Sequence, residues 1–233
     1  MKKKQLTTGI ILLVTFFLVL IIIFMPWFGK GRNGLEFSDD FFNSLAKGSS
    51  NFMADMRQLA TPFKGQVLGV DLTLKDADTA KRAEILFSKA GATVEVAGST
   101  LKINGDLGQI FLAAIDDSEA MFNNQGDKVQ ARYNLDPKKA LRIWWTSFKE
   151  LNTALNLQQK FREAKAANEI MLRAIEPGYN FFGIPVEMVR DNIGLLTFLL
   201  VFYVIYTLWY GYGVFELFEG LGLGAEKGHK EEV

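Results

Sequence analysis

The sequence predicts an α+β membrane protein, in which two transmembrane helices flank an extracytoplasmic domain with a ferredoxin-like (β-α-β-β-α-β) subdomain and a long helix. Three observations predict this class. The 233-residue chain has one long uncharged stretch near each end. Between them, short alternating and helix-like segments follow one another in the order of that subdomain. A long run of helical periodicity then follows.

Composition excludes several kinds of functional site. The 26 Lys and Arg residues balance 26 Asp and Glu residues, so no basic excess predicts a nucleic-acid partner. The chain contains no cysteine, which excludes disulfides, thiolate nucleophiles and thiolate-bound clusters. Its one histidine, His229, lies in a polar tail, so a histidine-based metal site or triad would need a partner chain. We therefore expect no cofactor, no metal ion and no catalytic residue.

Residues 1–29 are expected to form a cytoplasmic N-terminus and the first transmembrane helix. The uncharged stretch runs from Gln5 to Gly29, and about 20 helical residues cross the roughly 30 Å hydrocarbon core. Lysines at positions 2–4 precede it, as they would in a signal peptide. The long apolar run and the absence of a small-residue cleavage site at 25–28 favour an uncleaved anchor instead.

Residues 30–64 are expected to form a polar linker and an amphipathic helix, since apolar residues recur near helical spacing before Pro62. Ser38 is the expected N-cap of this helix, and Asp39 and Asp40 fall in its first turn.

Residues 65–135 are expected to form the ferredoxin-like subdomain, with a mixed α/β subdomain of another topology as the alternative. Asp76 and Asp106 are placed to cap its two helices, and Gly91 is placed to end the first. Because this fold serves many unrelated functions, it assigns none. The expected helices cover 77–90 and 107–122, and the expected strands cover 67–74, 93–96, 100–103 and 128–133.

Residues 136–176 are expected to form the long helix, with Asp136 as its cap and Pro137 at its first position. A continuous helix would extend about 58 Å; the alternative is a break near residues 152–156. Trp144 and Trp145 are neighbours on this helix and point about 100° apart, so one can enter the core while the other contacts a partner. The alternative is that both cover the subdomain.

The chain after the long helix is expected to return to the membrane. Residues 177–191 predict a membrane-interface segment, 192–217 the second transmembrane helix, and 218–233 a cytoplasmic tail. The second half of that helix is rich in aromatic residues and glycines, which are typical of an interfacial belt and of close helix contact. Its expected partner-binding residues are Tyr206, Trp209, Tyr210, Gly211 and Gly213.

The flanking charges predict the orientation. The lysines at 2–4 favour a cytoplasmic N-terminus, and two spans return the C-terminus to the same side. The central domain is then extracytoplasmic. A lysine-led anchor without a cleavage site indicates a bacterial plasma (inner) membrane.

Paired carboxylates occur at Asp39-Asp40 and at Asp116-Asp117. Adjacent acids of this kind usually cap a helix or lie on an exposed turn, so we expect no catalytic role for them. Residues 123–127 match a divalent-ion loop only loosely and predict a polar turn. The glycines at 220–224 lack the lysine and hydroxyl residue of a phosphate loop.

We therefore expect a non-catalytic, membrane-anchored subunit. Its extracytoplasmic domain and its helices would mediate assembly with other membrane-protein subunits, or with copies of itself, in the lipid bilayer. One alternative is a ligand-binding sensor or receptor that relays to a partner. Others are an accessory subunit of a transporter or channel, and an enzyme that uses carboxylates and backbone groups alone.

Overall fold

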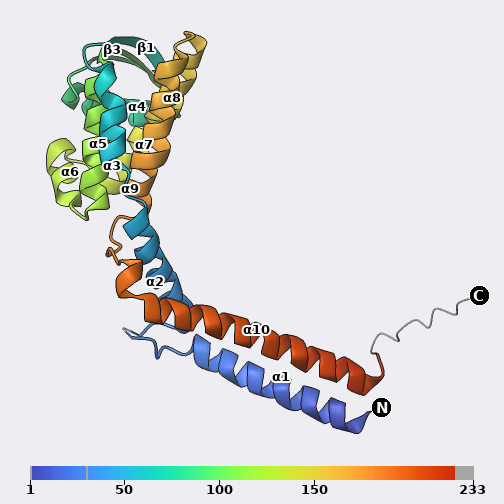
Figure 1. The fold of residues 1–233 in the computed structure, drawn as a ribbon. Coiled ribbons are helices and arrows are strands. Elements are labelled where there is room, and N and C mark those ends of the chain that lie inside the picture. The colour runs from blue at the N-terminus through green and yellow to red at the C-terminus, as the bar shows by residue number, and fades with distance from the viewer. Residues whose placement is uncertain (1, 30, 224–233) are drawn as a thin grey trace, which may run out of the picture. The chain divides into compact units, whose positions relative to one another are not determined.

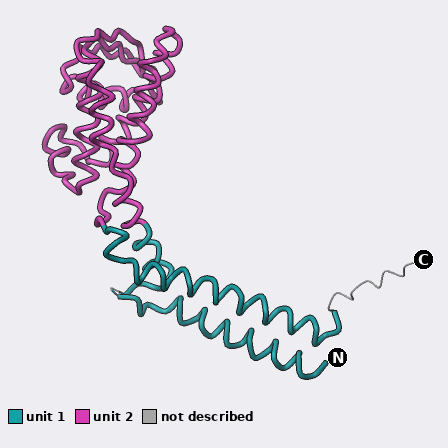
Figure 2. Tube along the Cα trace, viewed as in Figure 1, with its two compact units in different colours: residues 1–42, 187–233 teal, residues 43–186 magenta. Residues whose placement is uncertain are grey.

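The computed structural model describes residues 2–29 and 31–223, and the chain divides into two compact units (Figure 2). The first unit contains residues 1–42 and 187–233. The second unit contains residues 43–186.

The first unit is built on two apolar helices, α1 (Lys3–Phe24) and α10 (Ile193–Leu221), which lie side by side and antiparallel (Figure 1). Both are long and apolar enough to cross a membrane, and few residues of either helix are fully buried within the protein. At about 1.5 Å per residue, even the shorter helix extends about 33 Å. A short 3-10 turn, η3 (Val189–Asp191), precedes α10.

Glycines set the spacing between α1 and α10. A Cβ atom on Gly220 would lie 2.4 Å from the backbone nitrogen of Leu6, and one on Gly9 would lie 2.5 Å from that of Leu217. Both distances are too short for any side chain, so only glycine permits this close helix contact.

Helix α2 (Gly34–Ser49) begins earlier than expected, and the prediction of Ser38 as its cap is wrong. The Asn33 side-chain oxygen accepts from the backbone N–H groups of Leu35 and Glu36, and the Glu36 carboxylate accepts from the N–H of Asn33. This reciprocal pair is a capping box. The Ser38 hydroxyl instead donates to the Gly34 carbonyl within the helix. A break then separates α2 from α3 (Met53–Ala60) and the 3-10 turn η1 (Thr61–Phe63).

The second unit contains a three-stranded antiparallel sheet in the order β1-β3-β2. Strands β1 (Val67–Thr73), β2 (Thr93–Ala97) and β3 (Thr100–Asp106) agree with the first three expected strands. In the central register, Ile103 of β3 pairs with Val70 of β1 and with Val94 of β2. Alternate residues of β1 are buried, which leaves its other face exposed.

The prediction of a fourth strand at 128–133 is wrong, because this segment forms helix α6 (Gly126–Tyr133). Val129 and Tyr133 are buried, and they fit either structure, because positions i and i+4 share a face in a helix as well as in a strand. Ala131, between them, distinguishes the two structures, since it is exposed. Asn134, in the left-handed conformation at φ 53°, ends the helix. The complete ferredoxin-like pattern is therefore not present.

Helices α4 (Ala77–Lys89) and α5 (Leu107–Phe122) begin at the expected caps. The Asp76 carboxylate accepts from the N–H of Thr79 at 2.7 Å, and this hydrogen bond lowers the pKa of Asp76. The Asp106 carboxylate accepts from the N–H of Gln109 at 3.1 Å. Each cap satisfies an N–H group that the helix leaves without an internal acceptor.

The long helix expected over 136–176 is divided into several segments. Helix α7 (Pro137–Leu157), capped by Asp136, ends at a turn in which Gln159 has a positive φ of 60°. Helix α8 (Phe161–Ile170) continues as one π-helical turn, η2 (Met171–Ile175), and then as the short helix α9 (Glu176–Asn180). The chain therefore turns back after α7 instead of projecting as one rod.

Helix α7 lies at the centre of the second unit, where it contacts β1, α4, α5, α6, α8 and α9. In Figure 1 the sheet lies at one end of this unit, and α6 and α9 lie towards the other. The core around α7 is aromatic: the ring of Trp144 lies 5.1 Å from that of Phe87 and 5.8 Å from that of Phe148. All three side chains are fully buried, so these contacts hold α4 and α7 together.

Candidate functional site

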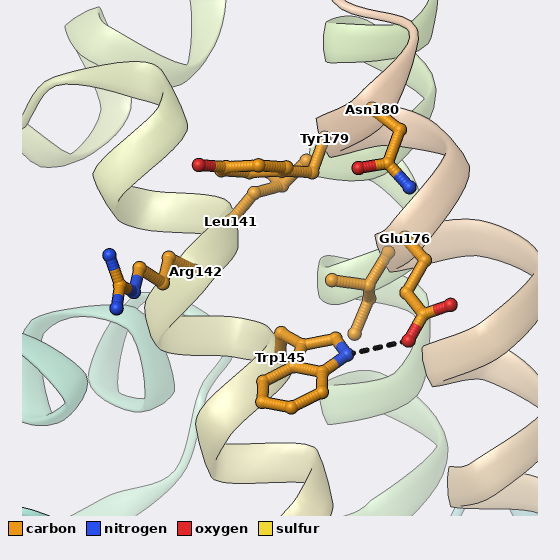
Figure 3. A pocket seen from close by; sticks show the side chains of 7 residues that line it. Leu141, Arg142, Trp145, Glu176, Tyr179 and Asn180 are labelled. Carbon is orange, nitrogen blue, oxygen red and sulfur yellow. Dashed lines mark hydrogen bonds between the residues drawn. The ribbon is translucent and has the colours of Figure 1, made fainter.

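A cleft of about 400 Å³ lies between α7 and the segment formed by η2 and α9 (Figure 3). We call it the α7–α9 cleft. Its floor is apolar and aromatic, and its rim carries polar and charged groups. The cleft is lined by Leu141, Arg142, Trp145, Ile175, Glu176, Tyr179 and Asn180.

The sequence around Pro177 builds one wall of this cleft. Proline has no N–H to donate to the preceding turn. In the turn just before it, the N–H of Glu176 bonds to the carbonyl of Met171 in the wider π-helical pattern. Gly178 then packs against α5, where a Cβ would lie 2.7 Å from the carbonyl oxygen of Ser118. Glu176 and Tyr179 therefore reach the cleft from a segment fixed against the core.

Trp145 and Tyr179 are the half-buried aromatic side chains of the cleft. The indole N–H of Trp145 donates to the Glu176 carboxylate at 2.8 Å (Figure 3). The amino group of Lys149 lies 5.7 Å from the centre of the Trp145 ring, and that of Lys138 lies 5.7 Å from the centre of the Tyr179 ring. These cation–π contacts leave both amino groups exposed beside the cleft.

Arg142 lines the α7–α9 cleft and also a second cleft, of about 280 Å³, between α7 and the start of α4. We call the latter the α4–α7 cleft. Within the described part of the chain, no hydrogen bond or ion pair engages the Arg142 guanidinium. In Figure 3 it projects to the same side as the hydroxyl of Tyr179. The α4–α7 cleft is lined by Lys75, Asp76, Asp78, Thr79, Arg82, Lys139, Arg142, Ile143 and Thr146.

Asp117 forms a buried polar cluster that was not expected, since adjacent acids such as Asp116 and Asp117 usually cap a helix or are solvated. The carboxylate is fully buried and accepts from the hydroxyl of Tyr133, from the indole N–H of Trp144 and from Arg132. Burial raises the pKa of Asp117 despite these three donors, and it also raises the pKa of Tyr133. None of these four side chains lines either of the two clefts described above. The cluster joins α5, α6 and α7.

Asp116 occupies a different environment, on the surface of α5. It and Glu119 both form ion pairs with Arg57 of α3. The shared guanidinium therefore links α3 to the surface of α5.

Lys47 is a second buried charged group. Its amino group is fully buried and donates to the carbonyls of Phe181 and Ile184, at 2.9 and 2.6 Å, and to the side-chain oxygen of Asn124 at 3.2 Å. These neutral oxygens accept all three donors of the ammonium group. Desolvation lowers the pKa of Lys47. Asn124 also accepts from the N–H of Gly183, so the 123–127 turn holds the 181–184 segment in place.

The structure separates the expected partner-binding residues between the two units. Trp144 lies in the core and Trp145 lines the α7–α9 cleft. In the first unit, Tyr206 donates to the Phe16 carbonyl at 3.0 Å, and Trp209 donates to the Leu12 carbonyl at 3.1 Å. Both of these side chains therefore contact α1.

The remaining expected residues differ in their surroundings. A Cβ on Gly213 would lie 3.2 Å from the Cβ of Leu12, whereas a Cβ on Gly211 would meet nothing within 4 Å. Tyr210 is 46% exposed, although its ring lies 5.0 Å from that of Phe16.

Sequence reasoning missed Arg142, Glu176 and Tyr179 as residues of the cleft. Glu176 lies in the Glu-Pro-Gly segment that predicted a helix stop, and a stop signal does not show which helix the following residues contact. Arg142 lies three positions before Trp145, at a spacing that places both on one helix face. That spacing was the available signal for Arg142.

Among residues 2–29 and 31–223, no group of three or more His, Asp or Glu side chains is placed to hold a metal ion. Comparisons with protein families, with curated proteins and with solved structures found no match to this chain.

Proposed function

We propose that this protein is a non-catalytic, two-pass subunit of a membrane complex, and that its second unit docks another protein through the α7–α9 cleft. The observation that carries the proposal is Trp145, a half-buried indole held in place by Glu176 at the edge of an open cleft. Tryptophan, tyrosine and arginine are the residues that most often dominate binding energy at protein interfaces. All three types line this cleft.

The membrane location is part of the proposal. Helices α1 and α10 expose apolar side chains along their lengths, and water would not tolerate such a surface, whereas lipid would. The lysines at 2–4 favour a cytoplasmic N-terminus, and the antiparallel pairing of α1 and α10 returns the chain to the same side. Residues 43–186 are then extracytoplasmic. The membrane that α1 and α10 cross is a bacterial plasma membrane.

Protease accessibility tests this orientation. Protease added to intact spheroplasts should digest residues 43–186 and leave the C-terminal tail intact. Digestion of the tail with protection of residues 43–186 would show that the protein has the opposite orientation. Release of the protein by an alkaline carbonate wash would contradict membrane insertion.

Purification of the full chain in a mild detergent tests the docking role. We expect a second protein, or further copies of the chain, to co-purify with the wild type. Trp145→Ala should lose this association. Phe161→Ala is the matched control, since Phe161 is a 64% exposed aromatic residue at the turn after α7 and lines neither cleft. A lone monomer, or equal association in both variants, would contradict the proposal.

A ligand-binding sensor is the second candidate, and the size of the cleft favours it. A volume of about 400 Å³ lies within the range of roughly 300–1,000 Å³ that is typical of small-molecule sites. Mass spectrometry of the denatured, purified protein distinguishes the two functions. A stoichiometric small molecule that is absent from Trp145→Ala would favour the sensor.

A further inference from the structure

We propose that the surface of α7 between its two clefts binds an acidic segment of a partner protein, with an apolar side chain of that segment seated against Trp145. This inference rests on the proposed docking function and adds the chemistry of the partner. We call this region the α7 cationic surface. It carries the exposed or half-exposed side chains of Lys75, Arg82, Lys138, Lys139, Arg142 and Lys149.

The acidic groups of the α7 cationic surface are already engaged within the chain. Asp76 accepts from the N–H of Thr79 as the cap of α4. Asp78 pairs with Arg82 at 2.9 Å. Glu176 accepts from the indole of Trp145. These three acids face the six cations of the surface, so they neutralise only part of its positive charge.

The cations are less engaged than the acids. In the described part of the chain, no ion pair or hydrogen bond engages the amino group of Lys139 or the guanidinium of Arg142, although the backbone N–H of Lys139 donates to the Asp136 cap. Lys138 and Lys149 rest over aromatic rings, which leaves their charge unneutralised. Lys75 lies beside Asp76 and partly offsets it. The surface therefore has a net positive charge, which complements an anionic partner.

The shape of the surface favours a peptide segment over a small anion. Arg142 is shared by the two clefts, which lie on either side of α7 and together extend from α4 to α9. The α7–α9 cleft offers an apolar floor from Leu141, Ile175 and the ring of Trp145. A segment that crosses α7 can place an apolar side chain on this floor and its carboxylates beside Lys139 and Arg142.

The test measures peptide binding to the full chain in detergent by fluorescence anisotropy. The probe is a fluorescein-labelled peptide that repeats Glu-Glu-Leu, and its counterpart repeats Lys-Lys-Leu. We expect the acidic peptide alone to bind, and its affinity to fall as NaCl rises from about 0.05 M to about 0.5 M. The double variant Lys139→Glu and Arg142→Glu should weaken binding at least roughly tenfold, because it places like charges against the peptide.

The matched control is the double variant Lys128→Glu and Lys165→Glu. It changes the net charge equally, at exposed positions that line neither cleft, and it should bind as the wild type does. Equal binding of the lysine peptide, no salt dependence, or full binding by the Lys139 and Arg142 variant would each overturn the inference. Displacement of the acidic peptide by phosphatidylglycerol vesicles, but not by phosphatidylcholine vesicles, would assign the surface to lipid headgroups and overturn it as well.

The two proposals fail in distinguishable ways. If a protein co-purifies through Trp145 but is retained by the Lys139 and Arg142 variant, docking stands and acidic recognition falls. If no protein co-purifies with the wild type, the docking function itself falls.

Discussion

Asp116 and Asp117 are adjacent in the sequence, yet they belong to different environments. Successive helical residues point about 100° apart, so Asp117 of α5 enters the core while Asp116 meets Arg57 at the surface. Burial removes water from the Asp117 carboxylate, and the three donors around it only partly replace that water, which is why its pKa is raised. A buried acid of this kind makes stability depend on pH.

We predict that the wild type loses thermal stability relative to Asp117→Asn as pH rises. Because the folded pKa of Asp117 is above the unfolded value of 3.8, its contribution to the free energy of unfolding is fully present below that value. It is lost as pH rises through the raised folded pKa. Thermal unfolding in detergent, followed by circular dichroism from about pH 3.5 to about pH 8, measures this. Asp116→Asn is the surface control, and a wild type that gains stability relative to Asp117→Asn would contradict the prediction.

Lys47 is buried without a carboxylate partner, so its contribution depends on the oxygens around it. Lys47→Met keeps the apolar stem and removes the three donors, so the carbonyls of Phe181 and Ile184 lose their charged donor and keep one donor each, the N–H of Ile184 and the side-chain amide of Asn124. We expect the free energy of unfolding to fall by roughly 2–4 kcal/mol. Chemical denaturation in detergent measures this, with Lys81→Met at an exposed position of α4 as the control. Equal stability of both variants would show that Lys47 holds nothing in place.

Among the elements, α6 is the clearest test of the fold. As a helix it buries Val129 and exposes Ala131, whereas the strand predicted from the alternating pattern would bury both. We therefore predict that Ala131→Lys changes the free energy of unfolding by less than about 0.5 kcal/mol. Val129→Lys should cost several kcal/mol, because it buries an unpaired charge. Similar destabilisation by both variants in chemical denaturation would favour the strand.

Local signals predicted where α4, α5 and α7 begin. Asp76, Asp106 and Asp136 each begin a helix at the expected position, because a side-chain cap acts within three residues. The strand error at 128–133 arose where a six-residue pattern fits both periods, and contacts with the rest of the chain decided the structure. Ser38 lost its expected role because Asn33 and Glu36 form a reciprocal cap upstream of it.

The candidate site was predicted only in part. Trp145 stood out because two adjacent tryptophans on a helix point about 100° apart and so cannot both enter the core. Its partners Glu176 and Tyr179 lie about 30 residues further along the chain, and they reach the cleft through the turn after α7 and the π-helical turn before Pro177. Local sequence patterns give neither the distance nor the relative direction of α7 and α9. The contribution of Glu176 and Tyr179 to the cleft could therefore be found only from the structure.

For the chain as a whole, the pairing of α1 with α10 joins its two ends. Leu6 lies beside Gly220, and Leu12 lies beside Trp209 and Gly213. As residue numbers increase along α1, the residue numbers of their contacts on α10 decrease, as antiparallel packing requires. The N–H of Lys2 also donates to the Gly220 carbonyl, and its amino group pairs with Glu219 at 2.6 Å. The long stretch between these helices therefore begins and ends at the same end of the pair.

A disulfide between introduced cysteines tests this pairing against a cysteine-free background. Because a Cβ at position 213 would lie 3.2 Å from the Cβ of Leu12, near the roughly 3.5–4.5 Å range of disulfides, Leu12→Cys with Gly213→Cys should cross-link on mild oxidation. After proteolysis of residues 43–186, the fragments with α1 and α10 should migrate together without reductant and separate with it. Leu12→Cys with Gly211→Cys is the matched control, since a Cβ at Gly211 meets no atom within 4 Å. Cross-linking of both pairs to the same extent, or of neither, would contradict the packing of α1 against α10 on which the two-pass arrangement depends.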